Sequence, residues 1–388
     1  MVAARRGHWS ARGGVPTWGR MRQVLHVVGA RPNFMKVAPL HRALARVPGI
    51  TQRLIHTGQH HDSSMSDVFF KELDLPPPSL HLDIHGGHHG EATGRMLIEL
   101  ERICLELRPE LISVVGDVNS TLAASLVAAK LQIPLAHVEA GLRSGDRSMP
   151  EEINRIVTDR LADLCLTPSP DADAHLRREG VEESRIRRVG NIMVDTLLSL
   201  RERALRRDAL ERLGLRPGAY ALCTLHRASN VDSDEQLGEL MQTLVEISER
   251  IPLVFPVHPR TAKALQRIGL ADRLARATRL KLIEPQGYLD FLCLSAQARL
   301  VLTDSGGLQE ETTVLGIPCL TLRNSTERPI TVEEGTNQIV GTVPEDILAA
   351  VEDVLARGGK RGRVPALWDG HTAERIAQLY AELLDAPS

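Results

Sequence analysis

Short runs of β-branched and apolar residues alternate with longer amphipathic stretches from Arg22 onward. The apolar runs of the first half are RQVLHVVGA (22–30), TQRLIHTG (51–58), ELISVVGD (110–117) and IPLAHVEA (133–140). Helical patterns cover residues 32–45 and NSTLAASLVAAKL (119–131). Nearly continuous apolar strands separated by helices indicate parallel βαβ units with right-handed crossovers.

The same alternation restarts after RRVGNIMVDTL (187–197), which places a domain boundary near Gly190. The predicted strands of the second half are AYALCTL (219–225), IPLVFPV (251–257), RLKLIEP (279–285), ARLVLTD (298–304) and IPCLTL (317–322). The segment 370–386 has the pattern of an amphipathic helix. With 388 residues the chain is long for a single core. We therefore predict an α/β protein with two parallel-sheet domains, and its expected parts are a disordered basic tail (1–20), an N-terminal domain (21–190), a C-terminal domain (191–365) and a terminal helix (366–388).

Composition narrows the classes of partner. The net charge of −2 provides no overall basic field for nucleic acid, and 3% aromatic residues argue against platforms for stacking bases. No apolar run approaches the roughly 18 residues that a membrane span requires. Five scattered cysteines without a C-x-x-C pair favour small core residues in a reducing compartment. We expect a cytoplasmic protein that binds neither nucleic acid nor membrane.

One segment predicts an anion site. LVLTDSGGLQEETTVLG (300–316) contains a buried strand followed by Ser305, which can cap the next helix, and by Gly306 and Gly307, which open that helix without side-chain bulk. Backbone N–H groups at a helix N-terminus attract phosphate. Glu311, further along the helix, is placed to reach ribose hydroxyls. The alternative is a tight strand–helix turn in which serine and glycine only cap the helix.

Basic residues provide a counterpart in the first domain. Arg31 and Lys36 follow the first strand, and Arg328 stands in a similar loop of the second domain. Arginine offers a fork of donors to phosphate and lysine a point charge. Solvated surface cations are the alternative interpretation. Neither G-x-x-x-x-G-K-[ST] nor G-x-G-x-x-G occurs after the first strand, which excludes a P-loop NTPase and argues against NAD.

Carboxylates gather at the ends of two strands that flank the helix at 119–131. Asp117 and Glu139 end these strands, so the strands are expected to be neighbours, and Glu151 begins the next helix. Crowded, partly desolvated carboxylates acquire raised pKa values and suit general acid–base work near neutral pH. For Glu151 there is a second interpretation, a capping box with Ser148.

The helix after Pro150 has further expected features. Glu151 and Arg155 are spaced as an i,i+4 ion pair. Its buried stripe is predicted to consist of Ile153, Ile156, Val157, Leu161 and Leu164. The carboxylates and Arg155 would then point elsewhere.

Histidines occur at two further places. His226, with Arg227, ends the first strand of the second domain; such a histidine is usually structural, but opposite the carboxylates it would be a cation near a leaving diphosphate. The segment LHLDIHGGHHGE (80–91) carries four histidines whose spacing matches no usual zinc pattern. We interpret it as a polar loop and predict no metal site.

Taken together, the motifs resemble the non-hydrolysing UDP-N-acetylglucosamine 2-epimerase family. They occur in matching order and spacing from Arg22 to the C-terminal helix. The motifs are GARPNFMK (29–36), TGQHHD (57–62), GDVNSTLA (116–123), HVEAGLRSGD…MPEEINR (137–155), TLHR (224–227), PVHP (256–259), DSGGLQEE (304–311) and TERP (326–329). The resemblance implies a GT-B fold, in which two Rossmann-like domains face a central cleft and the last helix crosses back to the first domain.

The resemblance also implies the placement of a UDP-sugar. Ser305, Gly306 and Gly307 would hold the diphosphate and Glu311 the ribose. The uracil would lie near Gln286 and Phe291, and the residues completing the binding site would be Arg31, Lys36, Arg155 and Arg328. The family's catalytic positions correspond to Asp117, Glu139, Glu151 and His226.

The implied reaction is reversible epimerisation at C2 of UDP-N-acetylglucosamine, giving UDP-N-acetylmannosamine. A base removes the C2 proton as UDP leaves C1, and UDP adds back to the resulting 2-acetamidoglucal with protonation from the opposite face. Acid–base groups around the sugar explain the charges of 138–155. The resemblance implies no cofactor and no metal, and it implies a homodimer.

Some features depart from the family pattern or leave alternatives open. Gln59 and His60 match a regulatory site for a second substrate molecule, but Asp62 replaces a glutamine there, which argues against activation by substrate. The GARPN and HRASN variants also suit relatives that act on modified UDP-acetamido sugars. Other candidates are a hydrolysing epimerase, a GT-B glycosyltransferase and a non-catalytic sugar-nucleotide sensor.

Overall fold

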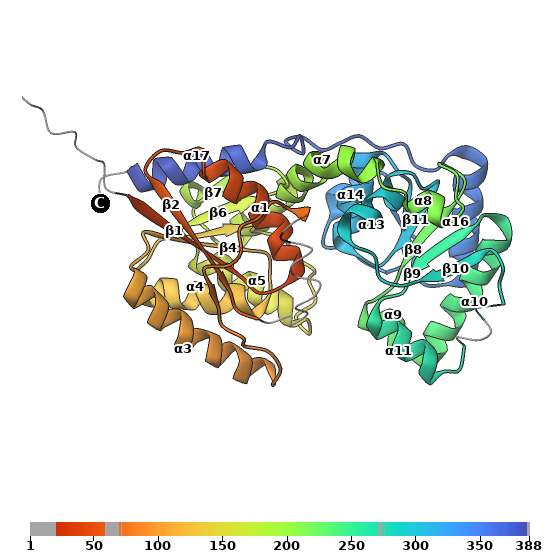
Figure 1. Ribbon diagram of the computed structural model, residues 1–388, viewed down its shortest axis with the longest axis horizontal. Helices are drawn as coiled ribbons and strands as arrows, with labels where there is room; N and C mark the ends of the chain where they lie inside the picture. The colour runs from red at the N-terminus through yellow and green to blue at the C-terminus, as the bar shows by residue number, and fades with distance from the viewer. Residues whose placement is uncertain (1–20, 59–69, 71, 271–273, 275, 386–388) are drawn as a thin grey trace, which may run out of the picture.

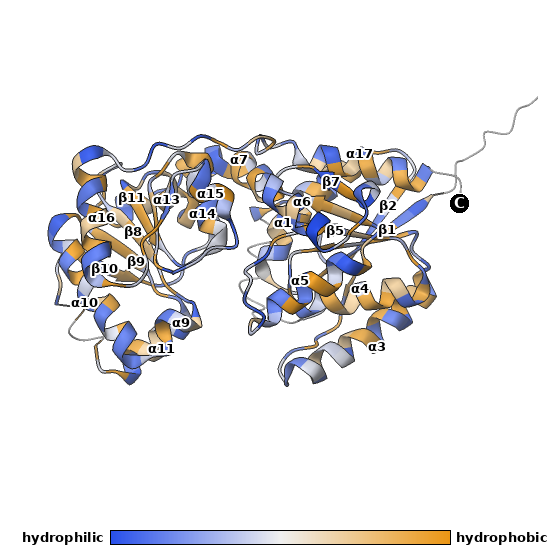
Figure 2. Ribbon diagram, turned by 180° about the vertical axis from the view of Figure 1, so that it is seen from behind, coloured by the Kyte–Doolittle hydropathy of each residue, from blue (hydrophilic) through white to orange (hydrophobic). Residues whose placement is uncertain are grey.

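Two parallel β-sheets flanked by helices form two domains that lie side by side (Figure 1). The computed structural model describes residues 21–58, 70, 72–270, 274 and 276–385, with only the backbone of Arg31. The predicted α/β class with two Rossmann-like domains is confirmed. The central strands of both sheets are predominantly hydrophobic, and the outer helix faces are polar (Figure 2).

The first sheet has seven parallel strands in the order β3-β2-β1-β4-β5-β6-β7. Its strands are β1 (Arg22–Val28), β2 (Ile50–His56), β3 (Leu80–His81), β4 (Leu111–Val115), β5 (Leu135–Val138), β6 (Leu164–Thr167) and β7 (Ile186–Arg188). The chain reverses its direction of winding between β1 and β4, and at such switch points parallel sheets bind ligands.

Alternate residues of β1 face opposite sides of this sheet. Val24 and Val28 belong to one apolar cluster, and Leu25 and Val27 belong to another. The helices of the domain are α1 (Arg31–Leu44), α3 (His89–Leu107), α4 (Asn119–Leu131), α5 (Pro150–Leu161), α6 (Pro170–Arg178) and the 3₁₀ turn η1 (Glu183–Arg185). Figure 1 shows α1 on one side of the sheet, with α3, α4 and α5 on the other.

The second sheet has six parallel strands in the order β10-β9-β8-β11-β12-β13. Its strands are β8 (Ala221–Thr224), β9 (Leu253–Pro256), β10 (Leu280–Ile283), β11 (Leu300–Thr303), β12 (Cys319–Thr321) and β13 (Asn337–Ile339). Its helices are α8 (Ala209–Arg212), α9 (Ala228–Val231), α10 (Asp234–Arg250), α11 (Pro259–Arg267), α13 (Tyr288–Ala296), α14 (Gly306–Leu315), α15 (Pro329–Glu333) and α16 (Pro344–Arg357). Here the switch point lies between β8 and β11.

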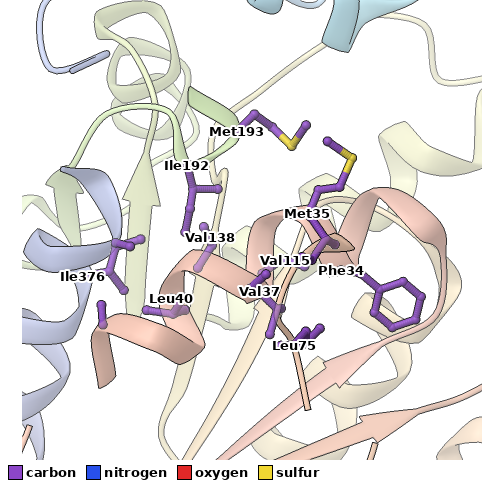
Figure 3. Close-up of a cluster of buried hydrophobic side chains, with 14 of the residues drawn as sticks. Phe34, Met35, Val37, Leu40, Leu75, Val115, Val138, Ile192, Met193 and Ile376 are labelled. Atoms are coloured by element: carbon purple, nitrogen blue, oxygen red, sulfur yellow. The ribbon is translucent and has the colours of Figure 1, made fainter. Parts of the chain in front are cut away.

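Two segments join the domains. Helix α7 (Ile192–Leu205) packs against α1 of the first domain and α13 of the second, and one apolar cluster includes residues of all three helices. Helix α17 (Thr372–Asp385) lies against α1 and α7, and the Tyr380 hydroxyl is 2.7 Å from that of Ser113 in β4. Figure 3 shows Ile376 of α17 close to Leu40 of α1. The last helix therefore packs on the first domain, while the residue limits predicted for the domains remain predictions.

Several expectations about individual residues can be compared with the fold. Strands β4 and β5 pair, as expected for the strands that end near Asp117 and Glu139. All five cysteines are free and buried, as expected for core residues. Four short strands, β3, β6, β7 and β13, have no counterpart among the predicted strands. Leu164, assigned by its pattern to the stripe of a helix, lies in β6.

Candidate active site

The first-domain part of the site is built around the switch point between β1 and β4. Asn33, on the first turn of α1, accepts hydrogen bonds from the backbone N–H groups of Gly29 and Ala30 at 3.0 Å. Its amide donates to the carbonyl of Val115 at 3.1 Å. A single buried side chain thus joins the ends of two neighbouring strands, and it fixes the loop from which α1 begins.

Lys36 and Glu139 form a buried ion pair beside this loop. Lys36 Nζ contacts Glu139 Oε2, and the two side chains are 11% and 4% exposed. Glu139 has a φ of 68°, a left-handed conformation that is uncommon for residues with a side chain. Its second oxygen, Oε1, is buried and accepts no hydrogen bond from the part of the chain that the structure describes. The loop thus holds a buried carboxylate with one oxygen paired and one unpaired within the described residues.

Asp117 is held by Arg155. The guanidinium donates to Asp117 Oδ2 from Nε at 2.9 Å and from Nη2 at 2.6 Å. Burial alone would raise the pKa of Asp117, but Arg155, followed by Lys36 and Arg328, outweighs burial and holds the pKa below its usual range. The side chain remains 31% exposed. Asp117 is therefore an accessible, ionised carboxylate.

Arg155 is held in turn by Glu152. Glu152 accepts hydrogen bonds from Arg155 at 2.8 Å and from the backbone N–H groups of Ser144 and Gly145 at 2.9 and 3.0 Å. Glu152 is 2% exposed, whereas Glu151, on the same turn, is half-buried. Glu152 thus connects the loop 141–149 to the Arg155–Asp117 pair.

Several sequence expectations about α5 are wrong. The helix has Met149 at its N-cap without a side-chain cap, and the Ser148 hydroxyl bonds Asp146 instead of capping the helix. Arg155 pairs with Glu152 and Asp117, not with Glu151. The buried face consists of Glu152, Asn154, Arg155, Thr158 and Asp159. The residues expected there within the helix, which are Ile153, Ile156, Val157 and Leu161, are only half-buried. The polar face can be buried because its charged side chains find partners at the strand end and in the loop 141–149.

In the second domain, the switch point between β8 and β11 carries a buried carboxylate. Asp304, fully buried after β11, accepts from the backbone N–H groups of His226 and Arg227 at 3.0 and 2.9 Å. Its Oδ1 lies 2.9 Å from His226 Nδ1. Burial alone would raise the pKa of Asp304, but the bonds to His226 hold it below the usual range. Asp304 therefore orients His226, whose side chain is 39% exposed.

Helix α14 begins at the predicted glycines. Ser305 occupies the N-cap, but its side chain makes no capping hydrogen bond, so the predicted capping role of its hydroxyl is wrong. A methyl group added at Gly306 would lie 3.7 Å from Glu327 Oε2, and one added at Gly307 would meet nothing within 4 Å. The start of α14 is thus open, half-buried backbone of the kind that binds anions.

Arg328 connects the charges of the two domains. It bonds the buried Glu310 of α14. Burial alone would lower the pKa of Arg328, but Glu310, Glu139 and Asp117 raise it above the usual range. Burial raises the pKa of Glu310 above its ordinary value despite Arg328. Carboxylates of the first domain and cations of the second are thus close enough to influence one another.

A second arginine–carboxylate group lies beside this one. Glu327 accepts both arms of Arg323 at 2.8 Å and lies 3.5 Å from Arg227. Burial would raise the pKa of Glu327, but Arg323 and Arg227 lower it to about 2. Burial lowers the pKa of Arg227, and neighbouring arginines lower it further. Arg227 and Arg323 thus share one carboxylate, Glu327, and Asp304 is a second carboxylate close to Arg227.

Three residues predicted to contact the nucleoside have different surroundings. Glu311 is 6% exposed and accepts a hydrogen bond from Tyr288 Oη at 3.1 Å. Burial raises the pKa of Glu311 to about 7. Gln286 is half-buried and donates to the carbonyl of Glu284 at 2.6 Å. Phe291 packs, partly buried, in an apolar cluster of the second domain.

Some predicted residues cannot be placed. Gln59 and His60 lie outside the described residues, and of Arg31 only the backbone, at the start of α1, is described. In the histidine-rich segment, His81 contacts His56. Within the described ranges, no group of three or more His, Cys, Asp or Glu side chains could hold a metal ion.

The residues that sequence reasoning missed are mostly buried partners of the predicted ones. They are His137, Glu152, Asp159, Asp304, Glu310 and Glu327. The adjacent glutamates in PEEINR offered a signal for Glu152, because one of the two was expected to face solvent. No such signal existed for Glu310, because its neighbour Glu311 is buried as well. The others are revealed only by their contacts.

The chain is similar in sequence and in structure to known proteins. The fold and the site define a two-domain α/β protein. One domain carries a carboxylate cluster, and the other carries a helix N-terminus of the kind that binds anions. A family model described as UDP-N-acetylglucosamine 2-epimerase matches residues 42–381. A UDP-N-acetylglucosamine 2-epimerase of Methanocaldococcus jannaschii is 45% identical over 358 residues, which cover 91% of this chain and 97% of that protein. The chain belongs to the UDP-N-acetylglucosamine 2-epimerase family.

Further relatives bear on substrate and fold. A UDP-2,3-diacetamido-2,3-dideoxy-D-glucuronate 2-epimerase of Pseudomonas aeruginosa is 39% identical, covering 93% of this chain and all of that protein. The M. jannaschii epimerase in complex with UDP-GlcNAc and UDP superposes with a TM-score of 0.86 at 44% identity, covering 93% of this chain and 99% of that one. A sucrose-phosphate synthase of Thermosynechococcus elongatus, 16% identical with a TM-score of 0.62 and covering 94% and 100%, shares the fold alone. The two structural neighbours support the GT-B fold.

Proposed function

We propose that this chain is a non-hydrolysing epimerase that interconverts UDP-N-acetylglucosamine and UDP-N-acetylmannosamine. The observation that carries the proposal is the accessible, ionised Asp117 of the first domain, within electrostatic reach of Arg328 of the second domain. A base and a cation on opposite domains suit a reaction in which a proton leaves the sugar as the diphosphate leaves C1. The relatives named above support the substrate class.

In the elimination step, the C2–H bond breaks on one face of the sugar as the C1–O bond to UDP breaks. A carboxylate takes the proton, the C2–H electron pair forms a C1=C2 double bond, and the C1–O electrons leave with UDP. Asp117 can act as the base because it is ionised and partly exposed, although the low pKa that Arg155 imposes makes it a weaker base than the raised-pKa carboxylate expected from crowding. A positioned acid or base contributes about 10²–10⁴-fold to the rate. Return of a proton to the other face, with attack of the UDP oxygen at C1, completes the reaction.

The opposite face and the leaving group use the remaining residues. Glu139, with its unbonded buried oxygen, and Glu151 are proposed to act on the other face of the sugar. His226, Lys36 and Arg328 would stabilise the departing diphosphate. The diphosphate would accept hydrogen bonds from backbone N–H groups at residues 305–307. Glu311 would lie at the ribose, and Gln286 and Phe291 would lie near the uracil.

A modified UDP-acetamido sugar is the second candidate substrate. It is favoured by the relative from P. aeruginosa, which covers nearly the whole chain.

Every helix within the described ranges is too short or too polar to cross a bilayer. We propose a homodimer, as the family resemblance implies, and a cytoplasmic location, as the scattered cysteines suggest.

The test supplies each UDP-sugar separately to the purified chain. Approach to the same mixture of UDP-N-acetylglucosamine and UDP-N-acetylmannosamine from either side, followed by proton NMR, is the expected result. Free N-acetylmannosamine with stoichiometric UDP would refute the non-hydrolysing assignment. Turnover only of UDP-2,3-diacetamido-2,3-dideoxy-D-glucuronate would establish the second candidate instead.

A further inference from the structure

A histidine behind the two strand ends has hydrogen-bond acceptors at both ring nitrogens. His137 lies in β5 and is fully buried. Its Nε2 is 2.8 Å from the carbonyl oxygen of Gly116, and its Nδ1 is 2.6 Å from Asp159 Oδ1. The carbonyl can only accept, so Nε2 carries a proton. The state of the other nitrogen depends on Asp159.

Asp159 is an ionised carboxylate in this environment. Its Oδ2 accepts from the Gly141 N–H at 3.0 Å and from Arg143 Nη1 at 2.7 Å. With every neighbour donating to this carboxylate, Nδ1 of His137 also donates. The ring is therefore protonated at both nitrogens.

The surrounding charges are consistent with a cationic ring. Arg143 also forms a two-point pair with Glu179, at 2.7 and 2.6 Å. Arg143 is thus shared by two carboxylates, Asp159 and Glu179, and the His137 ring is the other donor to the Asp159 side chain besides the Gly141 N–H. The other titratable groups around this network, which contact its backbone carbonyls, are His175 at Gly141 and Cys165 and Arg185 at Asp159.

The ring of His137, with its bonds to Asp159 and to the Gly116 carbonyl, forms a bridge between the strand ends that carry Asp117 and Glu139. Gly116 immediately precedes Asp117, and Gly141 follows Glu139 by two residues. A chain of hydrogen bonds therefore runs from the Gly116 carbonyl through His137 and Asp159 to the Gly141 N–H. Asp159 follows Arg155 by one helical turn, so the same face of α5 holds both the backbone and the side chain at Asp117.

We propose that His137 is a positioning residue: as a doubly protonated ring between Asp159 and the Gly116 carbonyl, it fixes the spacing of the Asp117 and Glu139 carboxylates. The kinetic part of this inference rests on the proposed epimerase function. The protonation state does not, because it follows from hydrogen bonds in the folded chain. The ring does not touch the sugar and takes no part in proton transfer.

His26 offers a matched control in the same sheet. It is also a fully buried strand histidine, in β1, but Nε2 bonds the amide oxygen of Gln52 at 3.1 Å and Nδ1 makes no hydrogen bond within the described chain. Burial lowers the pKa of His26 to about 4. At about pH 8, where exposed histidines are neutral, His26 will show one unprotonated ring nitrogen and His137 none.

Long-range ¹H–¹⁵N correlation of histidine-labelled protein at about pH 8 measures this directly. The expected spectrum of the wild-type chain contains the signals of one histidine ring with two protonated nitrogens. These signals disappear in His137→Gln and in His137→Asn, and they remain in His26→Gln. An unprotonated nitrogen in the ring that either His137 variant removes would overturn the inference. Two His137 variants are available, so a folding failure of one leaves the assignment possible.

The variants also separate positioning from general stability. Glutamine at 137 keeps a donor near the Gly116 carbonyl and asparagine keeps one near Asp159, so each breaks one half of the bridge. Both are expected to lower kcat about 10²-fold with KM changed less than about threefold, since small misplacements of reacting groups cost this much. His26→Gln is expected to lower thermal stability while kcat is unchanged. Unchanged kcat in both His137 variants would refute positioning, whereas inactivity of the wild-type chain towards UDP-N-acetylglucosamine would refute only the proposed function.

Discussion

Glu311 gives a stability prediction of definite sign. The buried carboxyl has a pKa raised from 4.5 to about 7, chiefly by burial. Below about pH 4.5 the group is protonated in both the folded and the unfolded chain, so it adds no pH dependence. Between about pH 4.5 and pH 7, Glu311 has lost its proton in the unfolded chain but keeps it in the folded chain, so the free energy of unfolding falls as pH rises. At about 1.4 kcal/mol per unit, the total loss above pH 7 is about 3 kcal/mol.

Replacing Glu311 with glutamine removes this titration and keeps an acceptor for Tyr288. The variant is expected to match the wild type near pH 4.5 and to melt higher by roughly 6–12 °C near pH 8, at about 2–4 °C per kcal/mol for a domain of this size. Thermal unfolding by circular dichroism across this pH range provides the assay. Glu202→Gln, on an exposed position of α7, controls for the loss of a carboxylate and is expected to change stability by less than about 0.5 kcal/mol at either pH. A stability difference for Glu311→Gln that does not grow with pH would refute the reasoning.

Three other substitutions test separate parts of the account. Asp304→Asn removes the charge that orients His226 and is expected to lower kcat by about 10²–10⁴-fold in steady-state assays; unchanged kcat would exclude that role. Gly141→Ala places a methyl group 2.4 Å from the carbonyl oxygen of Ala172, at a residue whose φ is 83°. The free energy of unfolding is expected to fall by at least about 2 kcal/mol in thermal melts. Unchanged stability would contradict the geometry. Tyr380→Phe breaks a buried hydroxyl pair with β4 and is expected to cost about 1 kcal/mol in the same melts, with no change in KM.

The order of the main elements could be predicted because buried parallel strands are apolar on both faces. Helix α4 has the bounds that the NSTLAASLVAAKL pattern indicates, and the strands predicted from apolar runs are present within one or two residues at most ends. Three of the missed strands lie at sheet edges, β3 and β7 in the first sheet and β13 in the second. Too few residues of an edge strand are buried on both faces to leave a clear pattern. Strand β6 is interior and fully buried, and it was missed because Leu164 was assigned to the stripe of the preceding helix.

Helix α5 shows why the site was harder to predict. Its apolar residues suggested a buried stripe, yet the buried face carries Glu152, Arg155 and Asp159. A charged residue is buried only when partners satisfy it, and here the partners come from strand ends and loops elsewhere in the chain. Sequence patterns contain the donors and acceptors but not their pairing. The same reason hid Asp304, which is buried beneath His226.

The most direct test of the central claim is solvent exchange at C2. The purified chain is incubated with UDP-N-acetylglucosamine in D₂O, and the sugar protons are followed by NMR. The account predicts UDP-N-acetylmannosamine that carries deuterium at C2, with UDP remaining attached, and loss of this exchange in Asp117→Asn and Glu139→Gln. Epimerised product that retains the original proton at C2, or exchange that survives in both variants, would contradict acid–base catalysis by these carboxylates.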